Sequence, residues 1–156
     1  MDDRLTHLDE RGDARMVDVG PKAVTVRTAV AEAHVAMSRE VREALFEGRL
    51  PKGDAAAVVR VAAIMAAKRT PELIPLCHPI GLDAVEVSVE PTPEGARIEV
   101  TTRVEAKTGV EMEAMTAASV GAVALYDMIK GLDRSAVIGP VRLLRKTGGK
   151  SGEWSR

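Results

Sequence analysis

The chain has 156 residues, the size of one compact domain, and its 22 lysines and arginines nearly balance 23 aspartates and glutamates. A general nucleic-acid-binding surface is therefore not expected, and any anion site must be a local cluster. A single cysteine excludes an intrachain disulfide framework, and the longest uncharged apolar run, residues 114–126, is too short to cross a bilayer, so we expect a cytoplasmic protein without membrane contact.

The core is expected to consist of small side chains packed closely together. Apolar residues make up 46% of the sequence, yet it contains only one Phe, one Trp and one Tyr. Because aromatic residues usually supply much of the bulk of a small core, the backbones must approach one another closely here. This composition favours tight helix packing and burial between subunits.

The N-terminal part of the sequence predicts a leader followed by a strand. Residues 1–20 are polar, and we predict a flexible leader there. Residues 22–37 alternate in polarity with a change of phase near Val30, which predicts a long strand with a bulge. We expect a single domain over residues 21–145 and a basic, glycine-rich tail over residues 146–156.

Two helices are predicted next. Ser38 can cap a short helix that ends near Gly48. Asp54 can cap a second helix, "AAAVVRVAAIMAAKR", which ends at Thr70-Pro71. The second helix is apolar on almost all sides, so it must be covered on most of them.

A β-hairpin and a long helix follow. The segments "VEVSV" and "ARIEVTTRV" alternate in polarity, and residues 91–95 between them predict a turn. Thr108 and Glu111 match the T-x-x-E capping box, so we predict a helix from about Val110 to Lys130.

The last apolar stretch, residues 136–146, predicts a strand. Gly139-Pro140 interrupts it, which indicates an edge position or a bulge. The remaining segment, "KTGGKSGEWSR", is predicted to be a loop. Strands interspersed with helices, including an antiparallel hairpin, predict an α+β fold in which helices pack on one face of a mostly antiparallel sheet.

The adjacent Cys77 and His78 lie between two prolines in "LIPLCHPI". Neighbouring side chains point apart on an extended backbone, which argues against a thiolate–imidazole pair. Zinc needs about four ligands at workable spacings, and the rest of the sequence does not supply them. Two interpretations stay open: a rigid loop that presents backbone N–H groups and one imidazole, or a buried cysteine beside a surface histidine.

Three lysines lie where they could meet an anion. Lys52 in "LPKGD" precedes a predicted helix start, where it could bind phosphate or move protons, or be a solvated turn residue. Lys146 and Lys150 flank glycines in "KTGGKSG". This segment fails the Walker A pattern because Leu144 stands where the first glycine is required. It is either a phosphate-binding loop or a frayed basic tail.

Carboxylates lie at both ends of the long predicted helix. Asp127 and Lys130 are three residues apart and share one face, as a coupled acid and base or as a surface ion pair. Glu113 is in the first turn, where negative charge also stabilises the helix. At ~1.5 Å per residue, Glu113 and Asp127 are about 21 Å apart. If both serve one site, they must come from different subunits.

Five segments together carry a resemblance to a known family. They are "KGD" at 52–54, "AAKRTPELIPLCHP" at 66–79, "KTGVEMEAMTAASV" at 107–120, "YDMIK" at 126–130 and "IGPVRLLRKTGGKSG" at 138–152. In order and spacing they resemble the cyclic pyranopterin monophosphate synthases, the MoaC family of molybdenum-cofactor biosynthesis. The resemblance implies a ferredoxin-like fold and a homohexamer, a trimer of dimers, with sites at subunit interfaces.

The resemblance also implies a reaction, in which 3′,8-cyclo-7,8-dihydro-GTP is rearranged to cyclic pyranopterin monophosphate with release of pyrophosphate. It implies catalytic roles for Asp127, Lys130 and Lys52. The implied substrate-binding residues are Leu76, Cys77, His78, Met112 and Glu113, and we expect Lys146 and Lys150 to bind phosphates. No metal ligand set and no required cofactor are expected, and whether Mg²⁺ accompanies the triphosphate stays open.

The main alternative is an oligomeric binding module that senses a nucleotide without converting it. In that case the charge pairs would only stabilise helices, and the fold alone does not decide between the two. A structural scaffold is a third alternative.

Overall fold

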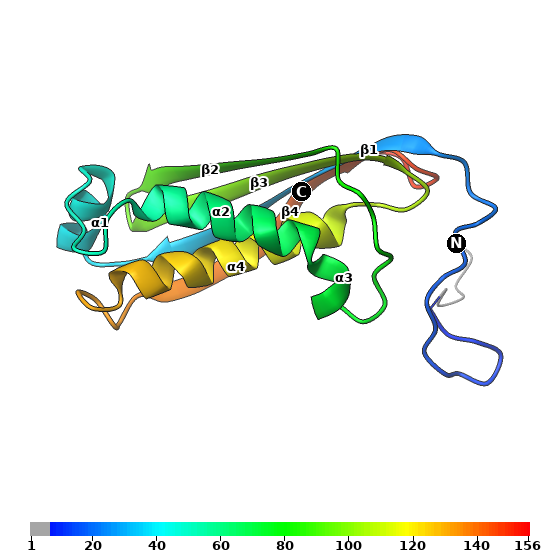
Figure 1. Ribbon diagram of the computed structural model, residues 1–156, viewed down its shortest axis with the longest axis horizontal. Helices are drawn as coiled ribbons and strands as arrows, with labels where there is room; N and C mark the ends of the chain where they lie inside the picture. Colours follow the sequence, from blue (N-terminus) through cyan, green and yellow to red (C-terminus); the bar gives the residue numbers. More distant parts are fainter. Residues whose placement is uncertain (1–6) are drawn as a thin grey trace.

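The computed structural model describes residues 7–156 as an α+β fold with one five-stranded antiparallel sheet (Figure 1). The strands lie in the order β2-β3-β1-β4-β5. The elements in chain order are β1 (Thr25–Ala36), α1 (Arg39–Phe46), α2 (Ala55–Lys68), α3 (Thr70–Leu73), β2 (Ala84–Thr92), β3 (Gly95–Ala106), α4 (Glu111–Ile129), β4 (Val137–Thr147) and β5 (Trp154–Ser155). The predicted α+β class is confirmed. The first six residues of the predicted leader lie outside the described part of the chain.

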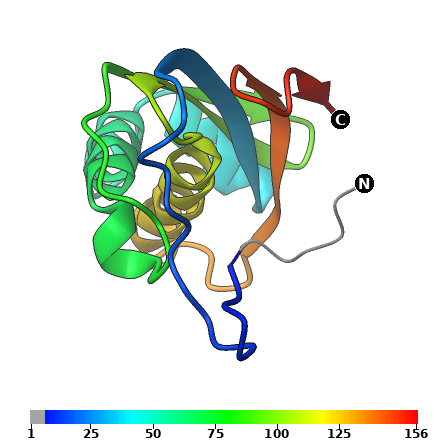
Figure 2. The same ribbon diagram turned by 90° about the vertical axis from the view of Figure 1, so that its right-hand side faces the viewer.

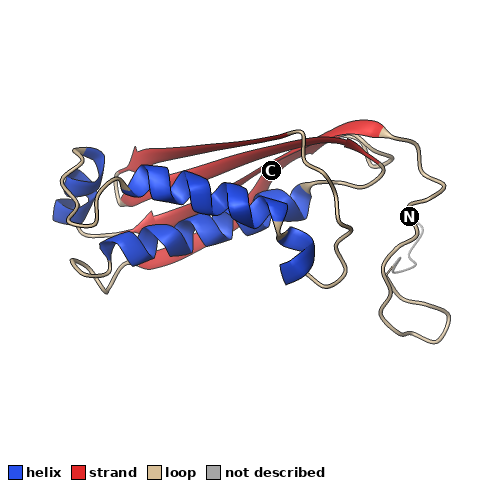
Figure 3. Ribbon diagram, viewed as in Figure 1, coloured by secondary structure: helices blue, strands red, loops and turns tan. Residues whose placement is uncertain are grey.

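The two long helices, α2 and α4, lie side by side and cover one face of the sheet (Figure 2, Figure 3). Alternate residues of β1, including Ala29 and Ala31, are fully buried in the core cluster. Between α2 and α4, Gly121 faces Ala63, and the absence of a side chain lets the two helices approach closely. The predicted core of small side chains is therefore confirmed. No helix within residues 7–156 is both long and apolar enough to span a membrane.

The pairing of β1 with β4 contains two irregularities. The first lies after Val30, where Leu144 of β4 has no partner, and it confirms the predicted bulge. The second lies at Gly139-Pro140. Because β5 pairs only with Arg145 and Lys146, β4 is an edge strand at Gly139-Pro140, as predicted.

The helix starts follow the predicted caps in two of three cases. The Ser38 side chain accepts a hydrogen bond from the backbone N–H of Val41, and Asp54 caps α2 in the same way. The predicted capping box of α4 is wrong, because Val110 is the N-cap and no side chain caps this helix. Val110 is buried, and its carbonyl accepts a hydrogen bond from Thr102 Oγ1 at 3.0 Å, so tertiary packing fixes where α4 begins.

Three local predictions also need correction. The hairpin turn is shorter than predicted, because β2 and β3 pair up to Thr92 and Gly95. Thr70-Pro71 does not simply end α2 but begins the one-turn helix α3, since proline is tolerated in a first turn. The tail is not all loop, because β4 continues to Thr147 and β5 returns along it.

Candidate functional site

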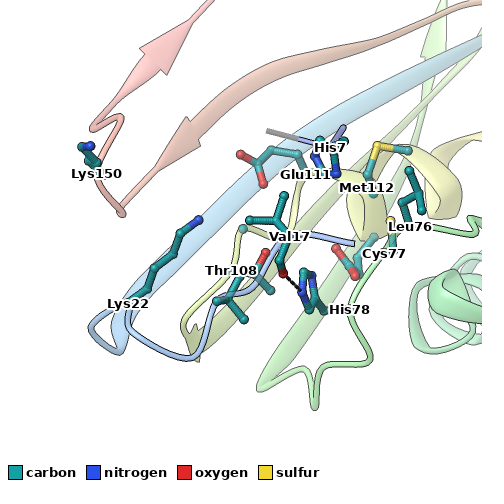
Figure 4. Close-up of a pocket in the computed structure, with 13 residues that line it drawn as sticks. His7, Val17, Lys22, Leu76, Cys77, His78, Thr108, Glu111, Met112 and Lys150 are labelled. Atoms are coloured by element: carbon teal, nitrogen blue, oxygen red, sulfur yellow. Dashed lines mark hydrogen bonds between the residues drawn. The ribbon is translucent and has the colours of Figure 1, made fainter. Parts of the chain in front are cut away.

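A pocket of about 440 Å³ opens at the N-terminal end of α4 (Figure 4). Its walls come from the N-terminal segment, the loop between α3 and β2, the first turn of α4 and the C-terminal loop. Six of the predicted substrate-binding residues line it, namely Leu76, Cys77, His78, Met112, Glu113 and Lys150. The fold therefore brings together residues that are up to 74 positions apart in the sequence. That these residues bind substrate is still a prediction.

Glu113 has the most unusual environment in this pocket. Its side chain is only 3% exposed, and burial, together with the nearby charge of Glu111, raises its pKa to about 7. A carboxyl group with this pKa changes its charge state near neutral pH. In its ionised form it can accept two hydrogen bonds from adjacent N–H donors, as the edge of a guanine-like ring presents them.

Replacing Glu113 with glutamine is expected to stabilise the fold at high pH but not at low pH. The folded state binds a proton at Glu113 more tightly than the unfolded state, so this group's contribution to stability falls as pH rises from 4.5 to about 7. A neutral glutamine avoids this loss of unfolding free energy, which amounts to roughly 3 kcal/mol above pH 8.

Chemical denaturation of both proteins at pH 5 and pH 8.5 measures this difference. Glu86→Gln, at an exposed position of β2 away from this pocket, serves as the control and should change stability similarly at both pH values. A stability difference between the Glu113→Gln variant and the unaltered protein that does not depend on pH would contradict the assignment.

Cys77 and His78 do not form a catalytic pair in this chain. Burial, and then the negative charge of Glu113, raise the pKa of the half-buried Cys77 thiol, which keeps it protonated. His78 Nε2 instead lies 2.6 Å from the carbonyl oxygen of Val17. The contact supports the first interpretation of this loop, in which one imidazole is held at a defined angle, and Cys77 forms part of the pocket wall.

A second pocket, of about 1020 Å³, adjoins the first and shares Lys22 and Lys150 with it. Arg27, from β1, also lines it. Lys146 does not line the first pocket, but its ammonium contacts Ser151 Oγ, and Ser151 lines the second. Sequence reasoning missed Lys22 and Arg27, because no local motif marks them.

The C-terminal loop reaches the second pocket through a close backbone contact. Gly148 has a positive φ of 88°, and a Cβ atom there would collide with the carbonyl oxygen of Val26. Arg27, the next residue, donates hydrogen bonds to the carbonyls of Ala106 and Lys107, both at 3.1 Å. The segment "TGG" lies against Arg27 of β1. A glycine pair near an arginine of a neighbouring strand is the signal that could have identified this pocket.

The predicted catalytic residues lie together at the opposite end of α4. Lys52 Nζ donates to the backbone carbonyl of Asp127 at 2.6 Å and lies 3.2 Å from Asp127 Oδ2. Lys130 Nζ lies 2.7 Å from Asp127 Oδ1. The turn that presents Lys52 requires Gly53, whose φ of 92° is readily adopted by glycine.

These contacts shift the pKa values of Asp127 and Lys130. Hydrogen bonds from Lys130 and Lys52 lower the pKa of Asp127, and the Asp127 carboxylate raises the pKa of Lys130. An ionised aspartate between two ammonium groups can stabilise developing charge and relay protons. The raised pKa keeps Lys130 in the ammonium form that a proton donor needs, but it also means that Lys130 holds this proton more tightly.

The two groups of residues are far apart within one chain. Glu113 and Asp127 lie in the first and last turns of the continuous helix α4, about 21 Å apart along its axis at ~1.5 Å per residue. Within residues 7–156, no three His, Cys, Asp or Glu side chains gather as a metal-ion site would require.

Comparison with known proteins adds independent information. A family model described as "MoaC family" matches residues 16–149. Three similar relatives are each named "Cyclic pyranopterin monophosphate synthase". The relative from Pelotomaculum thermopropionicum is 56% identical over 97% of this chain and 91% of its own length. Those from Corynebacterium efficiens and Chloroflexus aurantiacus are 56% and 54% identical, over 97% of this chain and 97% and 94% of their own lengths.

Proposed function

The chain belongs to the MoaC family, and from this membership we propose that it catalyses the reaction for which its relatives are named. The substrate is 3′,8-cyclo-7,8-dihydro-GTP, and the products are cyclic pyranopterin monophosphate and pyrophosphate. The observation that carries this proposal is the pocket in which Cys77, His78, Met112 and Glu113 meet beside Lys150. This is a largely buried carboxyl group next to basic side chains, which suits a purine-derived nucleoside triphosphate.

The chemistry of the pocket residues supports a division of roles. The ionised carboxylate of Glu113 accepts hydrogen bonds from the heterocycle, and Leu76, Cys77 and Met112 provide the surrounding wall. His78 contacts the sugar or a phosphate. Lys150 lines both pockets, so it can bind the triphosphate where they join.

The adjoining pocket provides further phosphate ligands. It is lined by Lys22, Arg27 and Lys150. Lys146 donates a hydrogen bond to Ser151, which also lines this pocket. Thr25 also lines it.

The Lys52–Asp127–Lys130 cluster is proposed to move the protons. The purine-derived ring opens and closes again as a pterin, and a ribose oxygen attacks the α-phosphorus, which breaks the bond to the pyrophosphate leaving group. Lys130, held as an ammonium by Asp127, is the candidate acid. No metal or other cofactor is required by this scheme, although Mg²⁺ bound to the triphosphate would be compatible with it.

We further propose that the active site forms between subunits of a homohexamer, a trimer of dimers. The β-α-β-β-α-β order and the strand order support a ferredoxin-like fold. Large apolar side chains stay exposed on the helix layer, including Val58, Val61 and Met65 on α2 and Val123 on α4. Contact between chains would bury them. The separation between Glu113 and Asp127 supports a site shared by neighbouring chains.

A cytoplasmic location remains a prediction from the sequence, based on its single cysteine and on the absence of a long apolar run.

Incubation of the purified protein with 3′,8-cyclo-7,8-dihydro-GTP tests the function. We expect pyrophosphate and, after oxidation, a fluorescent pterin to form in equal amounts, whereas GTP should yield neither. Stabilisation of the protein by the nucleotide without either product would instead indicate a binding module.

A further inference from the structure

Part of the pocket wall does not belong to the sheet or to the helices. We call residues 14–20 the N-terminal strap, and two of its side chains, Val17 and Val19, line the pocket. The strap crosses in front of the N-terminal end of α4 (Figure 2). Figure 4 shows Val17 beside His78, among the side chains that we propose to bind substrate. The strap therefore lies over the site.

The strap is attached to the rest of the protein by few polar contacts. His78 Nε2 bonds to the carbonyl oxygen of Val17 at 2.6 Å, and Lys107 Nζ donates to the carbonyl oxygen of Gly20 at 2.7 Å. Among the described residues, no backbone–backbone hydrogen bond joins residues 7–24 to the sheet or the helices. A segment held this way opens at a much lower free-energy cost than the fold as a whole.

The bond to Val17 occupies a donor that a nucleotide would also use. A carbonyl oxygen only accepts hydrogen bonds, so the Nε2 atom of His78 carries the proton. A phosphate oxygen is an acceptor of the same kind but carries negative charge. Hydrogen bonds to charged acceptors are roughly twice as strong as those between neutral groups. The nucleotide can thus replace Val17 at the same nitrogen and form a stronger bond.

We propose that the N-terminal strap is a latch on the substrate pocket, closed by the contact of Val17 with His78 and displaced when a nucleotide takes over the His78 donor. The inference rests on the proposed function of the pocket. Because the open form alone binds, the apparent dissociation constant equals the intrinsic one divided by the open fraction. Loosening the strap must then tighten nucleotide binding.

Two substitutions loosen the strap in different ways. Lys107→Met removes the hydrogen bond to Gly20 and preserves much of the side-chain length. Val17→Gly removes a half-buried apolar contact and makes the backbone beside His78 more flexible. Lys68→Met is the matched control, since Lys68 is exposed on α2 and does not line the pocket.

Two readouts separate opening of the strap from nucleotide binding. Cys77 is the only cysteine, and it lines the pocket, so its rate of alkylation by iodoacetamide reports opening without any ligand. Calorimetry gives the dissociation constant for GTP. One lost hydrogen bond corresponds to roughly a 2–10-fold change in the closing equilibrium. We therefore expect Cys77 alkylation to become 2–10-fold faster and GTP binding 2–10-fold tighter in both strap variants, with no change in Lys68→Met.

Two results would overturn the latch. Unchanged alkylation in both strap variants would mean that the strap does not close the pocket. Faster alkylation with weaker GTP binding would mean that the strap helps to hold the ligand. If the unaltered protein neither binds GTP nor converts the cyclic nucleotide, the proposed function fails, while the alkylation rates still decide whether the strap opens.

Discussion

Turnover is expected to fall by about 10²–10⁴-fold when Asp127 is replaced with asparagine, the range typical for loss of a positioned acid–base group. Asparagine keeps the shape of the side chain but removes the charge that binds Lys52 and Lys130, at 3.2 Å and 2.7 Å. It also removes the cause of the raised pKa of Lys130. Lys130, the proposed proton donor, would therefore lose both its orientation and part of its tendency to stay charged.

The design of this experiment must separate catalysis from folding. Asp127 is exposed, so the thermal midpoint and the oligomeric mass of Asp127→Asn should match those of the unaltered protein. Glu43→Gln is the matched control, because it breaks an exposed ion pair with Arg39 on α1 at the same kind of helical spacing. We expect full turnover from Glu43→Gln. Near-normal turnover from Asp127→Asn would reduce the Lys52–Asp127–Lys130 cluster to a surface ion-pair network.

The features that were predicted correctly depend on residues that are close to one another in the sequence. Ser38 and Asp54 cap their helices through contacts only three residues away, so the local pattern was sufficient. The start of α4 near Val110 was predicted correctly, but its capping box was not, because Val110 is held by Thr102 on another element and no side chain caps the helix. The bulge near Val30 was predictable because it interrupts a regular alternation in the strand itself.

In the candidate site, too, local segments could be identified from the sequence, whereas contacts between distant segments could not. The segments that contain Cys77, His78 and Glu113 were identified by resemblance, and the fold brings them into one pocket. Arg27 was missed because its role depends on the register of β1 and on the return of the C-terminal loop. The contact of Val17 with His78 could not be predicted either, since the strap carries no periodic pattern that would fix its path.

Mixed oligomers of two inactive variants are expected to regain activity if the active site is shared between chains. Lys52→Ala disables one end of α4, and Glu113→Ala disables the other. A hybrid site can combine the intact Lys52 end of one protomer with the intact Glu113 end of its neighbour. With random association at equal amounts, about one quarter of the sites have both ends intact. Recovery of about a quarter of the normal turnover is therefore expected, from two parents that are each nearly inactive.

Co-expression with two different affinity tags, followed by purification through both, isolates the mixed oligomers without relying on subunit exchange. Lys52→Ala mixed with Asp127→Asn is the matched control. The two residues lie 3.2 Å apart within one chain, so every site would retain a defect and no activity should return. If the Lys52→Ala and Glu113→Ala hybrids stay as inactive as their parents, the two ends of α4 do not serve one shared site. The 21 Å separation would then mean that Glu113 acts away from the reacting atoms, because no side chain of this helix can bridge it at ~1.5 Å per residue.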